Sequence, residues 1–109
     1  MPYDREFAQR VRDAFAPIEV ETKPMFGGLG FLMNGNMALA VMGKGGFMMR
    51  VPPADVDSLV GPHVRPMEMR GRPMTGWVKV DDEAVPTDED LQRFVRLAVE
   101  TTAAVPPKR

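Results

Sequence analysis

The sequence predicts one α+β domain built as two layers, an antiparallel β-sheet with helices on one face. Its 109 residues are enough for a single hydrophobic core and too few for two. Segments with helical periodicity lie near the two ends of the chain, and the alternating segments between them are joined by short glycine-rich turns. Such turns favour antiparallel neighbours. One more short helix is expected in the middle, and three helices can cover one face of this sheet but not both.

The N-terminal segment predicts a helix from about Tyr3 to Phe15. Phe7, Val11 and Phe15 recur every four residues and so form one apolar stripe. Asp4 is a suitable N-cap, and a proline two residues after the stripe ends the helix because it lacks a backbone N–H.

The segments that follow alternate between apolar and polar residues, as half-buried strands do. Asn34-Gly35 lies between two apolar runs and predicts a tight hairpin, because both turn residues must accept a positive φ. A second turn is expected where glycines recur over residues 43–46. The expected strands are Ile18–Lys23, Phe31–Met33, Met37–Met42 and Phe47–Val51.

A short helix and a hairpin are expected next. Pro53 suits the first turn of a helix, which ends near Val60. The segment Val64–Met69 predicts a strand, and Pro66 within it indicates an edge position because proline cannot donate to a ladder. A turn leads to the last expected strand, Met74–Val80.

The C-terminal segment predicts a helix that begins at Thr87 with a sequence resembling a capping box. The tail over residues 105–109 is expected to fray, so that a single domain spans residues 1–104. The apolar stripe of this helix consists of Leu91, Phe94, Val95 and Ala98.

The composition excludes most familiar enzyme classes. The chain has no cysteine, one histidine (His63) and one serine (Ser58). Disulfides, thiolate nucleophiles and Cys-ligated metals are therefore excluded, as is a site with several histidines. We expect no catalytic residue, no metal site and no cofactor.

The uncharged segment Pro24–Gly43 is long enough to cross a bilayer as a helix. Its five glycines and the Asn-Gly turn predict two paired strands instead. The charged N-terminal residues also exclude a secretory signal. We therefore expect a cytoplasmic protein without a membrane segment.

One motif indicates a family. Its residues are Met25, Phe26, Gly27, Gly28 and Gly30, followed by the turn residue Gly35. With the strands around it, this motif resembles the N-terminal domain of the TfoX/Sxy family, over about Phe7 to Thr102. The resemblance implies a secretion-chaperone-like fold of order α-β-β-β-α-β-β-α. It also implies a link to transcriptional regulation, because the founding members promote expression of competence genes together with the cAMP receptor protein. Those members carry a second, C-terminal domain, so we expect a stand-alone N-terminal domain to which no catalytic residue carries over.

Strand alternation predicts a contact surface on the sheet face away from the helices. Tryptophan, methionine and arginine are enriched at interfaces. The leading hypothesis is therefore a non-enzymatic module that binds a partner protein, for which a transcription regulator is one candidate. A self-complementary patch would favour a homodimer. The alternative is that the tryptophan lies flat on its own sheet. The candidate surface consists of Ala38, Ala40, Met48, Arg50, Trp77 and Lys79.

Two other functions remain open. A basic patch could hold the phosphates of a nucleic acid, although the net charge of -1 argues against direct binding. A pocket lined by the glycines and methionines could take a small molecule or a substrate. The chain has ten methionines, of which Met33, Met37, Met42, Met48 and Met49 cluster around the two expected hairpins, with Met67 and Met69 further along the chain. They favour an adaptable contact surface over a copper(I) site, since no His or Cys lies near them in sequence. The basic patch consists of Arg50, Arg65, Arg70, Arg72 and Lys79.

Overall fold

The computed structural model describes residues 3–25 and 27–107. Its helices are α1 (Arg5–Phe15), α2 (Val56–Leu59) and α3 (Asp88–Ala103), with the short 3-10 helices η1 (Pro53–Asp55) and η2 (Asp82–Ala84). Its strands are β1 (Glu21–Met25), β2 (Gly28–Met33), β3 (Asn36–Val41), β4 (Phe47–Arg50), β5 (Val64–Met69) and β6 (Arg72–Val80).

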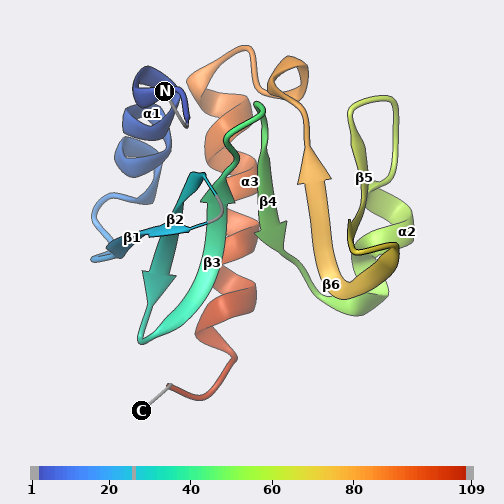
Figure 1. Cartoon of the computed structure of the whole chain (residues 1–109). Coiled ribbons are helices and arrows are strands. Elements are labelled where there is room, and N and C mark those ends of the chain that lie inside the picture. The colour runs from blue at the N-terminus through green and yellow to red at the C-terminus, as the bar shows by residue number, and fades with distance from the viewer. Residues whose placement is uncertain (1–2, 26, 108–109) are drawn as a thin grey trace.

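The strands form one six-stranded antiparallel sheet in the order β1-β2-β3-β4-β6-β5. Helix α3 lies behind the central strands in the view of Figure 1, and α1 packs against α3. The predicted two-layer α+β class is therefore confirmed. Four strands precede α2, one more than the family order implies. The Asn34-Gly35 turn separates β2 from β3, and β1, which comes earlier in the chain, forms a further strand that pairs with β2.

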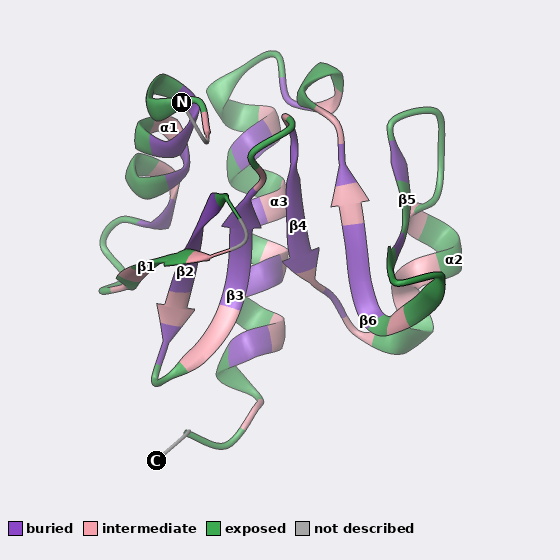
Figure 2. Cartoon of the chain, in the orientation of Figure 1, coloured by how far each residue is buried: buried purple, intermediate pink, exposed green. Residues whose placement is uncertain are grey.

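The core lies between the sheet and the helices. Phe7 and Val11 of α1 are packed in one cluster with Leu91 of α3 and with central strand residues such as Met49. Val56 of α2 contacts the same cluster, which places all three helices on one face of the sheet. Figure 2 shows that burial is concentrated in β2, β3, β4 and the second half of β6, whereas β1 and the β5–β6 turn are largely exposed.

Two predictions about the sheet are confirmed, the tight turn at Asn34-Gly35 and the edge position of the strand that contains Pro66. Asn34 and Gly35 have φ values of 53° and 81°, as a two-residue hairpin requires. Pro66 lies in β5, an edge strand. The first strand begins at Glu21 rather than Ile18, because the N–H of Ile18 still donates to Phe15 O in the turn after α1.

A β-bulge changes the alternation of β3. Phe31 pairs with Leu39 but Leu32 pairs with Met37, so Ala38 is an extra residue on β3. The structure therefore corrects the expectation for Ala38, which is fully buried in the core on the helix side. Met37 takes its place on the opposite face, where it packs against the cluster that contains Ala40 and Met48.

The described part of the chain contains no helix that is both long and apolar enough to span a membrane.

Candidate functional site

The sheet face away from the helices, here called the open face, carries an apolar cavity of about 290 Å³. We call it the methionine hollow, because most of the side chains around it are thioethers. Methionine is flexible and polarizable, so such a surface can adapt its shape to different apolar groups. The hollow is lined by Met25, Met37, Met42, Met48, Met67, Met69, Met74, Gly28, Ala40 and Val41.

Both edges of the sheet contribute walls to the methionine hollow. On one side β1 brings Met25 over Gly30 of β2. A Cβ at Gly30 would lie 2.7 Å from Met25 Cε and 3.3 Å from Met37 Sδ, so glycine leaves the space that these side chains occupy. On the other side the β5–β6 hairpin supplies Met67, Met69 and Met74. Figure 1 shows β1 and this hairpin at opposite edges of the sheet.

Trp77 lies on the predicted face but is only 9% exposed. It belongs to a small apolar cluster with Met48 and Met67. The Arg50 guanidinium covers the ring, with Cζ 4.8 Å from the ring centroid, and its Nε donates to Met37 O at 3.0 Å. Burial lowers the pKa of Arg50. The indole therefore packs beneath the open face and exposes little of its surface to a partner. This corrects the expectation that Trp77 is an exposed contact residue.

One row of residues crosses the open face at right angles to the strands. Alternate residues point to the same face, so directly paired residues across a sheet share a side. Lys79 and Arg65 both form ion pairs with Asp81, at 3.2 Å and 3.4 Å. The hydrogen bond from Lys79 is the largest influence and lowers the pKa of Asp81. Desolvation acts in the opposite direction, and the charges of Lys79 and Arg65 lower the pKa further. In register order the row is Lys23, Gly30, Ala40, Met48, Lys79 and Arg65.

The residues of the predicted basic patch do not form one surface. Arg65 and Lys79 are cross-strand neighbours that share the carboxylate of Asp81. Arg50 is occupied by Trp77 and a backbone carbonyl. Arg70 and Arg72 are exposed at the far end of the β5–β6 hairpin. The structure thus divides the patch into two cations that share one carboxylate, a half-buried arginine and two exposed arginines.

The glycines of the family motif serve the packing of β2 against its neighbours. A Cβ at Gly28 would lie 2.0 Å from Val41 O, so only glycine lets β2 and β3 approach this closely. Gly27 has a φ of 75° and turns the chain between β1 and β2. The motif leads into a strand and therefore has no helix N-terminus to cradle an anion. Phe26 lies outside the described residues.

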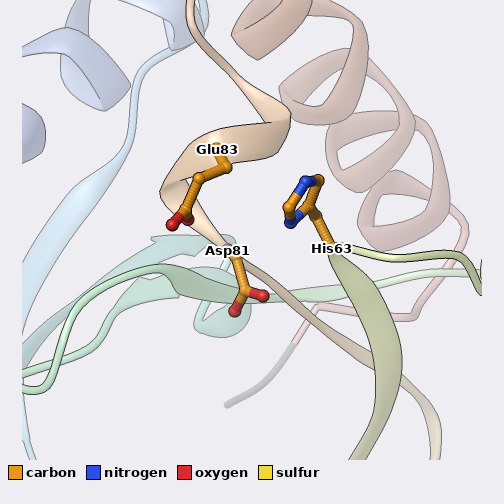
Figure 3. A group of neighbouring side chains, drawn as sticks. All are labelled: His63, Asp81 and Glu83. Carbon is orange, nitrogen blue, oxygen red and sulfur yellow. The ribbon is translucent and has the colours of Figure 1, made fainter.

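Sequence reasoning missed one cluster of possible metal ligands. Ligand atoms of His63, Asp81 and Glu83 lie within 4.8 Å of one another, as Figure 3 shows. His63 and Asp81 meet because the N–H of Asp81 donates to His63 O at 2.8 Å, a contact that no sequence spacing signals. The Asp81 carboxylate already faces Lys79 and Arg65, whose charges oppose a cation. We therefore interpret the cluster as part of a surface charge network.

A second hollow, of about 630 Å³, lies between the end of α3 and the segment that joins β4 to α2. Its rim combines carboxylates of Asp55 and Glu100 with Arg50 and with backbone at Gly76. No sequence motif indicated it, because its residues come from three distant segments. It is a broad, open depression, so we place the candidate site in the more enclosed methionine hollow.

The methionines divide between the two faces. The sequence signal was their number around the hairpins, and it did not separate core from surface. Met33 and Met49 are packed in the core beneath the helices, whereas Met37, Met42 and Met48 adjoin the open face. Met25 and Met74 are the members of the hollow that sequence reasoning did not include.

These features define a small α+β domain with helices on one sheet face and an apolar, thioether-lined hollow on the other. The family model for the TfoX N-terminal domain matches residues 13–102, and the chain belongs to this family. A search of curated proteins finds no significant match.

Proposed function

We propose that this domain is a non-enzymatic, cytoplasmic module that binds a partner protein through its open face and acts in transcriptional regulation. The methionine hollow is the observation that carries the proposal. An apolar cavity on a sheet face that the chain's own helices leave uncovered is the kind of pocket that receives an anchor side chain at an interface.

The lining of the hollow favours a protein over a polar metabolite. Small-molecule sites need a few polar groups that orient the ligand. The side chains that surround this cavity are methionine, alanine and valine. They can desolvate an aliphatic or aromatic side chain, but they offer a metabolite no side-chain hydrogen bond. Methionine-rich surfaces suit partners whose apolar side chains vary in shape.

The edges of the sheet direct a partner to the face. Both edge strands contain a proline, Pro24 in β1 and Pro66 in β5. A proline cannot donate to a ladder and therefore weakens strand addition at that edge. Docking across the open face, rather than pairing at an edge, is the mode that this sheet favours.

The regulatory part of the proposal rests on the family. Membership of the TfoX N-terminal domain family supports a role like that of the founding members, which act with a transcription regulator. The partner we propose is therefore a protein of the transcription machinery. A second copy of the chain and a nucleic acid are the competing occupants, and the experiment separates them.

Site-specific photo-crosslinking in the native cell tests this function. A photoreactive residue replaces Met69, which is 41% exposed at the rim of the hollow. The matched control carries the same residue at Glu89, which is exposed on α3. We expect a protein of the transcription machinery to be crosslinked from position 69 and not from position 89, and Ala40→Lys to abolish the product by placing a charge in the hollow.

Three results would contradict the proposal. Equal crosslinking from both positions would show that the open face is not selective. A crosslinked dimer of the chain would assign the face to a second copy. Binding of DNA or RNA by the protein would favour the nucleic-acid alternative if its affinity falls steeply with salt concentration. That binding should also be lost when the charges of Arg70 and Arg72 are reversed by substitution with glutamate.

A further inference from the structure

We infer that the occupant of the open face is an acidic amphipathic helix of the partner, lying along the row that crosses the six strands. This inference rests on the proposed function and adds the chemistry and geometry of the partner. Its basis is the row from Lys23 to Arg65, which has cations at its ends and small or apolar residues in its middle.

The middle of the row forms the floor of the methionine hollow, to which Ala40 and Met48 contribute. Met25 and Met37 cover Gly30, and Ala40 is only 6% exposed, so a partner would reach this floor with single side chains while its helix rests on the surrounding methionines. A partner helix could place one or two apolar side chains into the methionine hollow. Apolar residues at i, i+3, i+4 and i+7 form the stripe that such grooves recognise.

The length of the row fits a helix of ordinary size. Six strands are separated by five spacings of about 4.8 Å, which gives about 24 Å from Lys23 to Arg65 measured along the sheet. Because residues of β1 and β5 line one hollow, the sheet is curved and the direct distance is shorter. An α-helix rises about 1.5 Å per residue, so at most about 16 residues span the row. Carboxylates near the two ends of the stripe would then meet both cationic ends.

The charges around the hollow favour an acidic partner over a second copy. Lys23 is exposed at one end of the row. At the other end Arg65, with 57% of its side chain exposed, and Lys79 share the single carboxylate of Asp81, so this end keeps an excess of positive charge. Arg72 is exposed and lies directly opposite Met69 in the β5–β6 register. Two copies meeting through this face would bring these like charges together, which opposes association, whereas carboxylates on a partner would be attracted.

A charge-swap experiment with two synthetic peptides tests the inference. Both are helices of about 16 residues with the same leucine and phenylalanine stripe. One carries glutamate beside the stripe at both ends, and the other carries lysine there. Binding is followed by NMR of the intact chain with labelled methionine methyl groups. Met49, buried in the core, serves as the internal control for an intact fold.

We expect the acidic peptide to shift the methyl signals of Met25, Met37 and Met69 while that of Met49 stays in place. Its affinity should exceed that of the basic peptide by about tenfold, because each end of the row contributes a charge pair. The double variant Lys23→Glu, Arg65→Glu should reverse this preference. The control variant Arg12→Glu, Arg96→Glu changes the net charge equally on the helix-covered side and should keep the original preference.

Several outcomes would overturn the acidic helix. Equal affinity for the two peptides, an unchanged preference in the charge-reversed variant, or no shift with either peptide would each do so. Concentration-dependent shifts of Met25, Met37 and Met69 without peptide would assign the hollow to a second copy. The crosslinking from position 69 would still decide the broader protein-binding function, so the two failures are distinguishable.

Discussion

At Gly28 the chain has no room for a single methyl group, whereas at Gly30 the space is shared with mobile side chains. A Cβ at Gly28 would meet the backbone oxygen of Val41 at 2.0 Å. A Cβ at Gly30 would meet the tip of Met25, which can rotate away. Two glycines of one motif therefore have different roles, one in strand approach and one in the shape of the methionine hollow.

This difference predicts unequal costs of adding a methyl group. Gly28→Ala should lower the free energy of unfolding by about 3 kcal/mol, because the β2–β3 pair must separate locally. Gly30→Ala should cost about 1 kcal/mol and should displace Met25. Urea denaturation of the two variants measures both values. Equal losses would contradict the distinction between a backbone and a side-chain contact.

The thioethers should also differ in reactivity, because oxidation by peroxide follows exposure. Met69 is 41% exposed at the rim, whereas Met49 is fully buried under the helices. In dilute peroxide we expect sulfoxide at Met69 well before Met49, as measured by mass spectrometry of proteolytic peptides over time. Similar rates at both positions would show that the open face is not the exposed face in solution.

At the scale of elements, the ends of the helices and the bulge in β3 determine what each face presents. The Asp4 side chain caps α1 by accepting from the N–H groups of Glu6 and Phe7 at 2.9 Å and 3.1 Å. The cap fixes where α1 begins, and thereby which residues reach the core. The β5–β6 hairpin has a comparable role on the open face, since it positions Met67 and Met74 as one wall of the hollow.

Loss of the α1 cap should weaken the whole domain, because α1 covers part of the core. We expect Asp4→Ala to lower the free energy of unfolding by about 1 kcal/mol, the usual cost of losing an N-cap side chain. Asp4→Asn should keep most of the stability, since the amide oxygen can still accept. Thermal or urea unfolding compares the two, and equal destabilisation by both would contradict a capping role.

At the scale of the whole molecule, the ion pairs of Asp81 make the stability of the domain depend on pH. Lys79 and Arg65 hold the pKa of Asp81 below its ordinary value of 3.8. A carboxylate with a lowered folded-state pKa stabilises the protein above the unfolded pKa, and this contribution is lost as the pH falls through the folded pKa. The Asp81 network therefore contributes to stability at neutral pH and not in strong acid.

Replacement of this carboxylate tests the linkage. Asp81→Asn should show a smaller decline in the free energy of unfolding than the parent chain as the pH falls from about 5 to about 2. The measurement is urea denaturation at a series of pH values in that range. A decline of equal size in both proteins would show that the interactions of Asp81 with Lys79 and Arg65 do not persist in solution.

Local patterns predicted most of the elements, because their causes are local. The four-residue repeat of Phe7, Val11 and Phe15 predicted α1, and positive φ at Asn34-Gly35 predicted the first hairpin. The prediction that Ala38 lies on the open face was wrong, because a bulge arises from the pairing of two strands and leaves no local signature in the sequence.

The sequence by itself determined the α+β class, the family motif and the presence of many methionines near the hairpins. Only the tertiary structure decided that Met25 of the edge strand β1 and Met74 of β6 line one hollow, and that Arg50 covers Trp77. The physical reason is that periodicity is set by neighbouring residues, whereas register and sheet curvature depend on contacts between distant segments. The row from Lys23 to Arg65 exists only through five such strand pairings.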